Sequence, residues 1–132
     1  MKVAKAWEEP GVDVPAPHRR QIKVLFAPDK EGVDEVLFSL AILPPEGRTD
    51  YHRHDRPELI YVISGHGMCL CDGQETHIQE DVALWVLPGE QHQIINEGEA
   101  PLKLATFFIP PYTASNHYRR CLGGAEARPV KG

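Results

Sequence analysis

Three histidines and one glutamate stand at a spacing that suits a metal centre. His52 and His54 are separated by one residue, Glu58 follows four positions after His54, and His92 comes after a long interval. On an extended strand, positions 52 and 54 project to the same face, so both imidazoles can reach one point. Residues 55–57 (Asp-Arg-Pro) are typical of a turn, after which Glu58 opens a strand and can direct its carboxylate back to that point.

This set of donors favours a divalent transition metal ion. Imidazole and carboxylate together suit Mn, Fe, Ni, Co, Cu or Zn better than Mg or Ca, which prefer oxygen ligands. Four protein ligands leave coordination positions open, and an open position admits water, O₂ or a chelating substrate. Burying an ionised Glu58 without a cation would be costly, which argues against an empty site. We therefore expect one such ion, with a small-molecule substrate, at His52, His54, Glu58 and His92.

The elements that must position these residues are predicted to be short strands. The 12 prolines and 11 glycines lie between apolar segments, and Asp72-Gly73 suits the positive φ angles of a tight hairpin turn. A single flat sheet would leave an apolar face wet and two edges open, so about eight antiparallel strands favour an all-β sandwich or small barrel. The expected strands are 21–26, 35–43, 58–64, 68–71, 76–79, 82–87, 91–95 and 102–109.

The chain length predicts a single domain, residues 1–132, around one core. Residues 1–20 contain three prolines and suit an extended arm, which can cover a neighbouring subunit. Residues 21–110 are expected to form the barrel. Residues 111–132 are expected to form a tail with one short helix at 113–122, which acts either as a lid or as simple packing.

These residues resemble the two motifs of the cupin superfamily. The first motif is matched by Gly47, His52, His54, Glu58 and Gly65, with four residues between Gly47 and His52 where five are usual. The second is matched by Gly89, His92 and Asn96. Asp81 stands where that motif opens with glycine, and Leu87-Pro88-Gly89 replaces Pro-x-Gly. These departures change turns, not ligands, and the resemblance spans about residues 45–109.

The resemblance implies a small β-barrel of the jelly-roll type with the metal inside, often assembled as a homodimer. It also implies a metal-dependent enzyme that acts on a small oxygen-rich substrate, such as a carboxylate, a diketone or a sugar acid. Dioxygenases, decarboxylases, isomerases and lyases all belong to the family, so the motifs do not choose the reaction. No general base is identified, since no spare Asp, Glu or Lys can be placed in the cavity.

Two alternatives to an enzyme remain open. The first is a non-catalytic module that binds a sugar or a small carboxylate at the metal. The second is a structural metal site, which the open coordination position disfavours.

Composition and charge disfavour nucleic acid and membrane as partners. Lys and Arg number 14 against 19 Asp and Glu, a net charge of −5 that disfavours nucleic acid. No apolar run reaches the roughly 20 residues of a membrane helix, and the N-terminus lacks the pattern of a signal peptide, so we expect a cytoplasmic protein.

The odd cysteine count suits a reducing compartment. Cys69 and Cys71 are interpreted as buried small hydrophobes rather than as sulfur ligands.

The remaining histidines and aromatic residues are interpreted structurally. His18, His66, His77 and His117 are expected at the surface or hydrogen-bonded in the core. Tyr51, Arg53 and Tyr61 alternate away from the ligands and are expected outside the barrel. Asn96 can either bond within the barrel or serve a turn. Core packing is expected of Trp85, Phe107 and Phe108, one of which can line the pocket.

Overall fold

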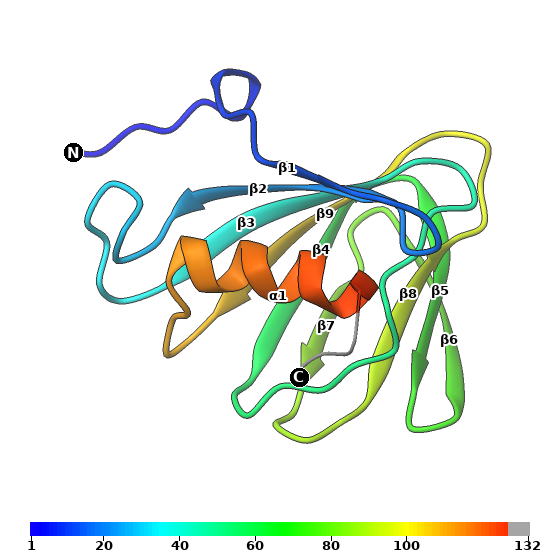
Figure 1. Ribbon diagram of the computed structural model, residues 1–132. Coiled ribbons are helices and arrows are strands. Elements are labelled where there is room, and N and C mark those ends of the chain that lie inside the picture. Colours follow the sequence, from blue (N-terminus) through cyan, green and yellow to red (C-terminus); the bar gives the residue numbers. More distant parts are fainter. Residues whose placement is uncertain (127–132) are drawn as a thin grey trace.

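The computed structural model describes residues 1–126, and nine strands dominate it (Figure 1). A short 3₁₀ turn, Ala6–Glu8, precedes them, and one helix, α1 (Ala114–Glu126), follows them. The strands are β1 (Val12–Val14), β2 (Arg20–Phe26), β3 (Leu37–Leu43), β4 (Glu58–Ser64), β5 (His66–Cys71), β6 (Gln74–Gln79), β7 (Ala83–Val86), β8 (His92–Asn96) and β9 (Leu102–Phe108).

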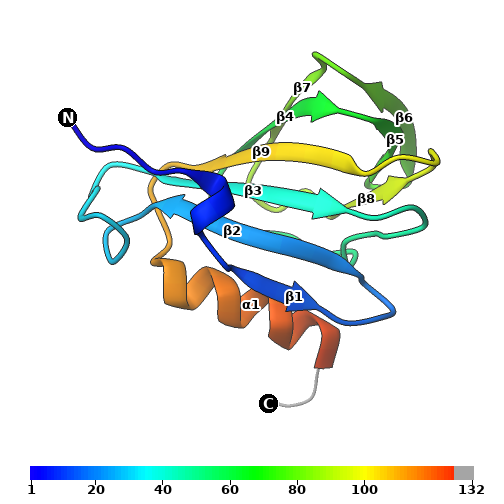
Figure 2. The same ribbon diagram turned by 90° about the horizontal axis from the view of Figure 1, so that it is seen from above.

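The strands form two antiparallel sheets. The larger has the order β1-β2-β3-β9-β4-β7, and the smaller has the order β6-β5-β8. Figure 2 shows the smaller sheet standing at one end of the larger one, so that the two curve around a common interior. This arrangement confirms the predicted all-β fold of jelly-roll type. All eight predicted strands are present, with ends within two residues of those expected.

Alternation along β3 and β9 places the core. The two strands pair in register, so Leu37 lies opposite Phe108, and Ala41 lies opposite Leu104. These four side chains are buried, as are most inward positions of β2, β4 and β8. Because successive side chains of a strand point to opposite faces, one face of the larger sheet supplies the interior of the barrel.

The N-terminal arm belongs partly to the barrel. Its strand β1 pairs with β2 at the edge of the larger sheet, with Val12 opposite Ile22. Farther upstream, Ala4 and Ala6 pack against an apolar cluster on the sheet that includes Leu25 and Leu40. The arm thus covers its own sheet as well as extending it.

The tail forms a longer helix than expected, Ala114–Glu126, which lies below β2 and in front of β3 and β9 in the view of Figure 1. The Asp29 carboxylate caps it by accepting hydrogen bonds from the backbone N–H groups of Ala114 (2.5 Å) and Ser115 (3.1 Å). The backbone N–H of Val24 donates to the Tyr118 hydroxyl oxygen at 2.8 Å. These bonds fix α1 to β2 and to the loop after it. Within residues 1–126, no helix has the length and apolar character needed to cross a bilayer.

Two turns contain residues with positive φ angles. Asp72 and Gly73 have φ angles of 48° and 83°, as the hairpin between β5 and β6 requires. Asp81 has a φ of 73° at the place where the motif has glycine. Aspartate tolerates this conformation better than most residues, so Asp81 supplies the positive φ that a glycine would otherwise supply.

Two of the three aromatic predictions for the core need correction. Trp85 is 58% exposed, because on the edge strand β7 it is the neighbouring Val86 that points inward. Phe107 is half-buried and stacks on Phe38, with ring centroids 4.7 Å apart. Only Phe108 is fully buried in the barrel.

Candidate metal centre

The structure brings the four predicted ligands together at one end of the barrel interior. Glu58 is the first residue of β4, and His92 is the first residue of β8. His52 and His54 lie in the preceding loop. That loop meets β8 in two isolated bridges rather than in the strand expected from the alternation: one joins Arg48 to Ile95, and the other joins His52 to His92. The backbone N–H of each residue in the second bridge donates to the carbonyl of the other, at 3.0 and 2.8 Å.

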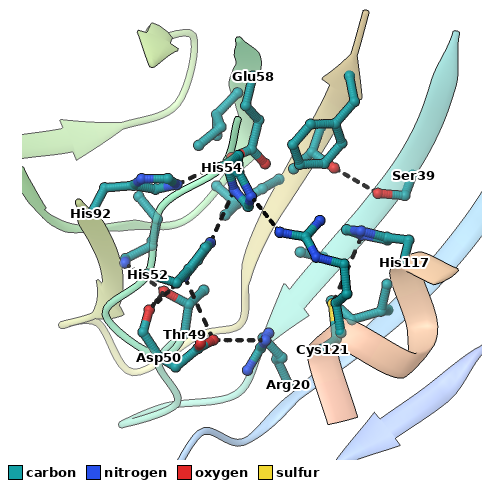
Figure 3. Close-up of a pocket in the computed structure, with 18 residues that line it drawn as sticks. Arg20, Ser39, Thr49, Asp50, His52, His54, Glu58, His92, His117 and Cys121 are labelled. Carbon is teal, nitrogen blue, oxygen red and sulfur yellow. Dashed lines mark hydrogen bonds and ion pairs between the residues drawn. The ribbon is translucent and has the colours of Figure 1, made fainter. Parts of the chain in front are cut away.

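The ligand atoms of these four side chains converge. One potential donor atom from each residue lies within 4.8 Å of the others, an arrangement that can hold a metal ion. The Nε2 atoms of His52 and His54 are 3.1 Å apart. Oε1 of Glu58 lies 3.2 Å from Nε2 of His54 and 3.2 Å from Nε2 of His92 (Figure 3).

Backbone carbonyls set the orientation of two of the rings. Nδ1 of His52 donates to the carbonyl oxygen of Asp50 at 2.8 Å, and Nδ1 of His92 donates to that of Glu90 at 2.9 Å. Because a carbonyl can only accept, the proton of each neutral ring is on Nδ1. The lone pair on Nε2 then faces the cluster, which is the arrangement that metal-binding histidines require.

The charge of Glu58 also fits a cation. Burial alone would raise its pKa, but the contacts of Glu58 with the His54 and His92 rings outweigh burial and hold the pKa well below its usual range. Burial likewise opposes charge on His92, yet its pKa is raised by the bond to Glu58. Burial lowers the pKa of His52 to about 4. A buried carboxylate among imidazoles fits a divalent transition metal better than it fits an empty cavity.

A cavity of about 120 Å³ adjoins the four donors, enough for a small molecule in place of several waters. Its wall is mainly apolar and comes from the inward faces of the strands: Ile22, Ala41, Ile60, Ile94, Leu104 and Phe108. Ser39 and Thr106 share a buried hydrogen bond of 2.6 Å in the same wall. The Arg20 guanidinium also lines the cavity, where it forms an ion pair with Asp50 at 3.3 Å.

Helix α1 supplies a part of the cavity that the sequence analysis missed. His117, Arg120 and Cys121 all line it. Figure 3 shows His117 and Cys121 on the helix beside the other lining residues. The spacing of the three residues (i, i+3 and i+4) places them on one face of a helix. From this spacing, their position side by side could have been predicted. His117 is buried rather than at the surface, and burial lowers its pKa to about 4. The C-terminal helix therefore contributes part of the cavity wall.

The positions of four other singled-out residues agree with the predictions. Tyr51, Arg53 and Tyr61 are exposed outside the barrel, as predicted. Asn96 does both things expected of it. Its side-chain amide donates to the carbonyls of Leu43 (3.0 Å) and Ala100 (2.9 Å), and its Oδ1 accepts the Gly98 N–H (2.8 Å).

The sulfur atoms do not form a paired site. Cys69 is buried in the main apolar cluster, as expected for a small hydrophobe. Cys71 lies near Asp72 and Glu90, whose carboxylates could with its sulfur surround an ion. These carboxylates already accept backbone hydrogen bonds, from Gln91 (3.1 Å) and Leu87 (2.8 Å) respectively, so their positions are explained by the loop itself.

Comparisons with known proteins agree with this architecture. The family model of the Cupin domain matches residues 39–109, which is more than half of the chain. The chain is 29% identical to the tetracenomycin polyketide synthase protein TcmJ of Streptomyces glaucescens, over 87% of this chain and 76% of that protein. It is 30% identical to an uncharacterized protein of Methanocaldococcus jannaschii, over 63% of this chain and 66% of that protein.

Solved structures show the same fold at low identity. A predicted oxalate decarboxylase from Thermotoga maritima superposes with a TM-score of 0.74 at 21% identity, covering 82% of this chain and 98% of that one. The polyketide cyclase RemF from Streptomyces resistomycificus gives a TM-score of 0.73 at 18% identity, covering 83% and 80%. With the family model matched across the barrel strands and both histidine motifs, the chain belongs to the cupin family.

Proposed function

We propose that this protein is a metal-dependent enzyme that acts on a small, oxygen-rich carbonyl substrate. One divalent transition metal ion would be held by His52, His54, Glu58 and His92. The observation that carries the proposal is the convergence of these four donors beside a cavity that the protein does not fill. A site that only stabilised the fold would be expected to surround its ion with protein ligands.

The reaction class follows from the chemistry of the site and its relatives. A bound divalent ion acts as a Lewis acid toward a substrate oxygen on which negative charge develops. Decarboxylation and polyketide cyclisation, the activities named for two structural neighbours, both act on carbonyl compounds. We therefore favour a decarboxylase, isomerase or lyase over a dioxygenase. In this chain, apolar side chains such as Ile60 and Leu104 would keep water from the reacting atoms.

The wider setting is also a proposal. We infer one domain over residues 1–132, a homodimer, a cytoplasmic location and no nucleic-acid partner. The net charge of −5 supports the last of these. The homodimer follows the habit of the family.

The metal content of purified variants tests the site. His92→Ala and His52→Ala are each expected to lose the ion that elemental analysis finds in the wild type. His77→Ala is the matched control, because His77 is an exposed strand histidine outside the site. Unchanged metal content in both ligand variants would refute the proposal.

Turnover then separates the reaction classes. We expect the metal-loaded protein to convert a keto acid or a diketone without consuming O₂, measured with an oxygen electrode and by product analysis. O₂ uptake that is stoichiometric with substrate would instead assign a dioxygenase. Binding of such compounds without turnover would assign the non-catalytic module.

A further inference from the structure

The guanidinium of Arg120 stands beside the four donors without a negative partner. Its Nη2 lies 3.0 Å from Nδ1 of His54, and its Cζ lies 4.1 Å from the centroid of the Tyr112 ring. Two other arginines near the site are paired: Arg20 with Asp50, and Arg56 with Asp55 at 2.9 Å. Among the side chains of residues 1–123, no carboxylate lies within ion-pair distance of Arg120.

The contact with His54 is incompatible with metal binding at that ring. A guanidinium can only donate, so Nδ1 of His54 must accept, and the proton of the neutral ring is on Nε2. Nε2 is the atom that faces Glu58 and the other donors. When Nε2 binds an ion, the proton of the neutral ring must be on Nδ1. There it would point at the N–H group of Arg120, which can only donate. Metal binding therefore releases Arg120 from its one polar acceptor.

When a divalent ion is bound at the four donors, the net positive charge of the cavity favours an anionic ligand. Arg20 and Asp50 cancel each other, and Glu58 offsets one of the two positive charges of a divalent ion. The remaining charge of the ion and the charge of Arg120 then face the same cavity. A planar guanidinium matches a carboxylate, because two parallel N–H donors meet two oxygens.

One ring nitrogen of His117, which also lines the cavity, has no hydrogen-bond partner among the described residues. That nitrogen is Nδ1, and it is buried. Nε2 of the same ring lies 3.8 Å from Sγ of Cys121. Buried polar atoms are normally satisfied, so an unpaired one in a cavity wall points to a polar ligand. His117 lies on α1 beside the cavity (Figure 3), and Arg120 comes from the same helix.

We propose that Arg120 binds a carboxylate of the substrate, with His117 as a further hydrogen-bonding group, while another oxygen of the same molecule lies at the metal. The substrate class is then metal-chelating carboxylates, such as dicarboxylates and keto acids, rather than neutral diketones or sugars. This inference rests on the proposed function, because it requires an ion at the four donors.

Malonate binding to the Co²⁺-loaded protein tests the inference, with the visible Co²⁺ spectrum and calorimetry as readouts. Arg120→Gln is expected to weaken malonate binding by about 10- to 100-fold, the usual effect of losing a charged hydrogen-bonding partner. Arg120→Lys keeps the charge but not the paired donors, and should fall between the wild type and Arg120→Gln. Imidazole, a neutral ligand for the open position, should bind all of these proteins equally.

Arg119→Gln is the matched control, because Arg119 is the exposed neighbour on the same helix and does not line the cavity. Its malonate affinity should equal that of the wild type. Arg120→Gln should also take up Co²⁺ at least as tightly as the wild type, since no contact with His54 has to be broken.

The outcomes separate the two proposals. If the wild type binds no Co²⁺ at the four donors, the proposed function and the role of Arg120 both fail. If Co²⁺ binds but malonate affinity is the same in Arg120→Gln, Arg120→Lys and Arg119→Gln, only the role of Arg120 is overturned. Should Arg120→Gln fail to fold, the comparison of Arg120→Lys with Arg119→Gln decides.

Discussion

Replacing His117 by leucine should make the stability of the metal-free protein less sensitive to acid. Burial, assisted by the charge of Arg120 and opposed by that of Glu58, lowers the pKa of His117 from 6.5 to about 4. The ring is therefore neutral in the folded protein at pH 5, whereas in the unfolded chain it is mostly protonated. Because the unfolded state binds the extra proton, this group lowers the free energy of unfolding as the pH falls from about 6.5 to about 4.

The magnitude follows from the shift. A change of one pKa unit corresponds to about 1.4 kcal/mol, so the full shift amounts to about 3 kcal/mol below pH 4. Between pH 7 and pH 5, the linkage relation gives a loss of about 2 kcal/mol from this one residue. Leucine cannot bind a proton in either state, so the variant should lose about 2 kcal/mol less than the wild type over that interval.

Urea denaturation at the two pH values, in the presence of a chelator, measures this difference. His77→Leu is the control, because His77 is exposed on β6 and its replacement should leave the wild-type pH dependence in place. The absolute stability of His117→Leu at pH 7 does not enter the comparison. The same change in unfolding free energy from pH 7 to pH 5 in all three proteins would refute the reasoning.

Three other substitutions test the packing around the site. Asn96→Ala removes three hydrogen bonds and should cost about 2 kcal/mol in urea denaturation; a loss below about 0.5 kcal/mol would contradict this. Gly65→Ala should lower the melting temperature more than Gly73→Ala, because a Cβ at Gly65 meets the Pro101 carbonyl oxygen at 2.6 Å and one at Gly73 meets nothing, although both have positive φ. Equal effects would show that backbone strain alone decides. Asp29→Ala should cost about 1 kcal/mol and speed hydrogen exchange at the Ala114 and Ser115 amides; unchanged exchange would show that the cap does not hold the helix.

The strands could be predicted because each is an apolar segment bounded by turn formers. The segment 58–64 was located to the residue, since Pro57 and Gly65 delimit it. The meeting of the four donors could be predicted as well. It depends on the short spacing of His52, His54 and Glu58, and on the family resemblance that brings in His92.

The contribution of the tail could not be predicted. A helix with apolar and polar residues on several faces does not reveal which face its neighbours will cover, and the bonds that settle it come from Asp29 and Val24, far away in sequence. Trp85 was misplaced for a related reason. One face of the edge strand β7 is exposed to solvent, and the presence of an aromatic residue does not by itself show which face that is.

The four converging donors and the helical wall of the cavity are carried by different stretches of chain. The donors lie between residues 52 and 92, whereas His117, Arg120 and Cys121 follow the last strand. A few contacts at β2 and the loop after it fasten the helix. The segment that supplies all four donors is thus distinct from the segment that lines the opposite wall of the cavity. Under the proposed function, grafting a different C-terminal segment onto this barrel would change the ligand that is accepted while all four donors stay in place.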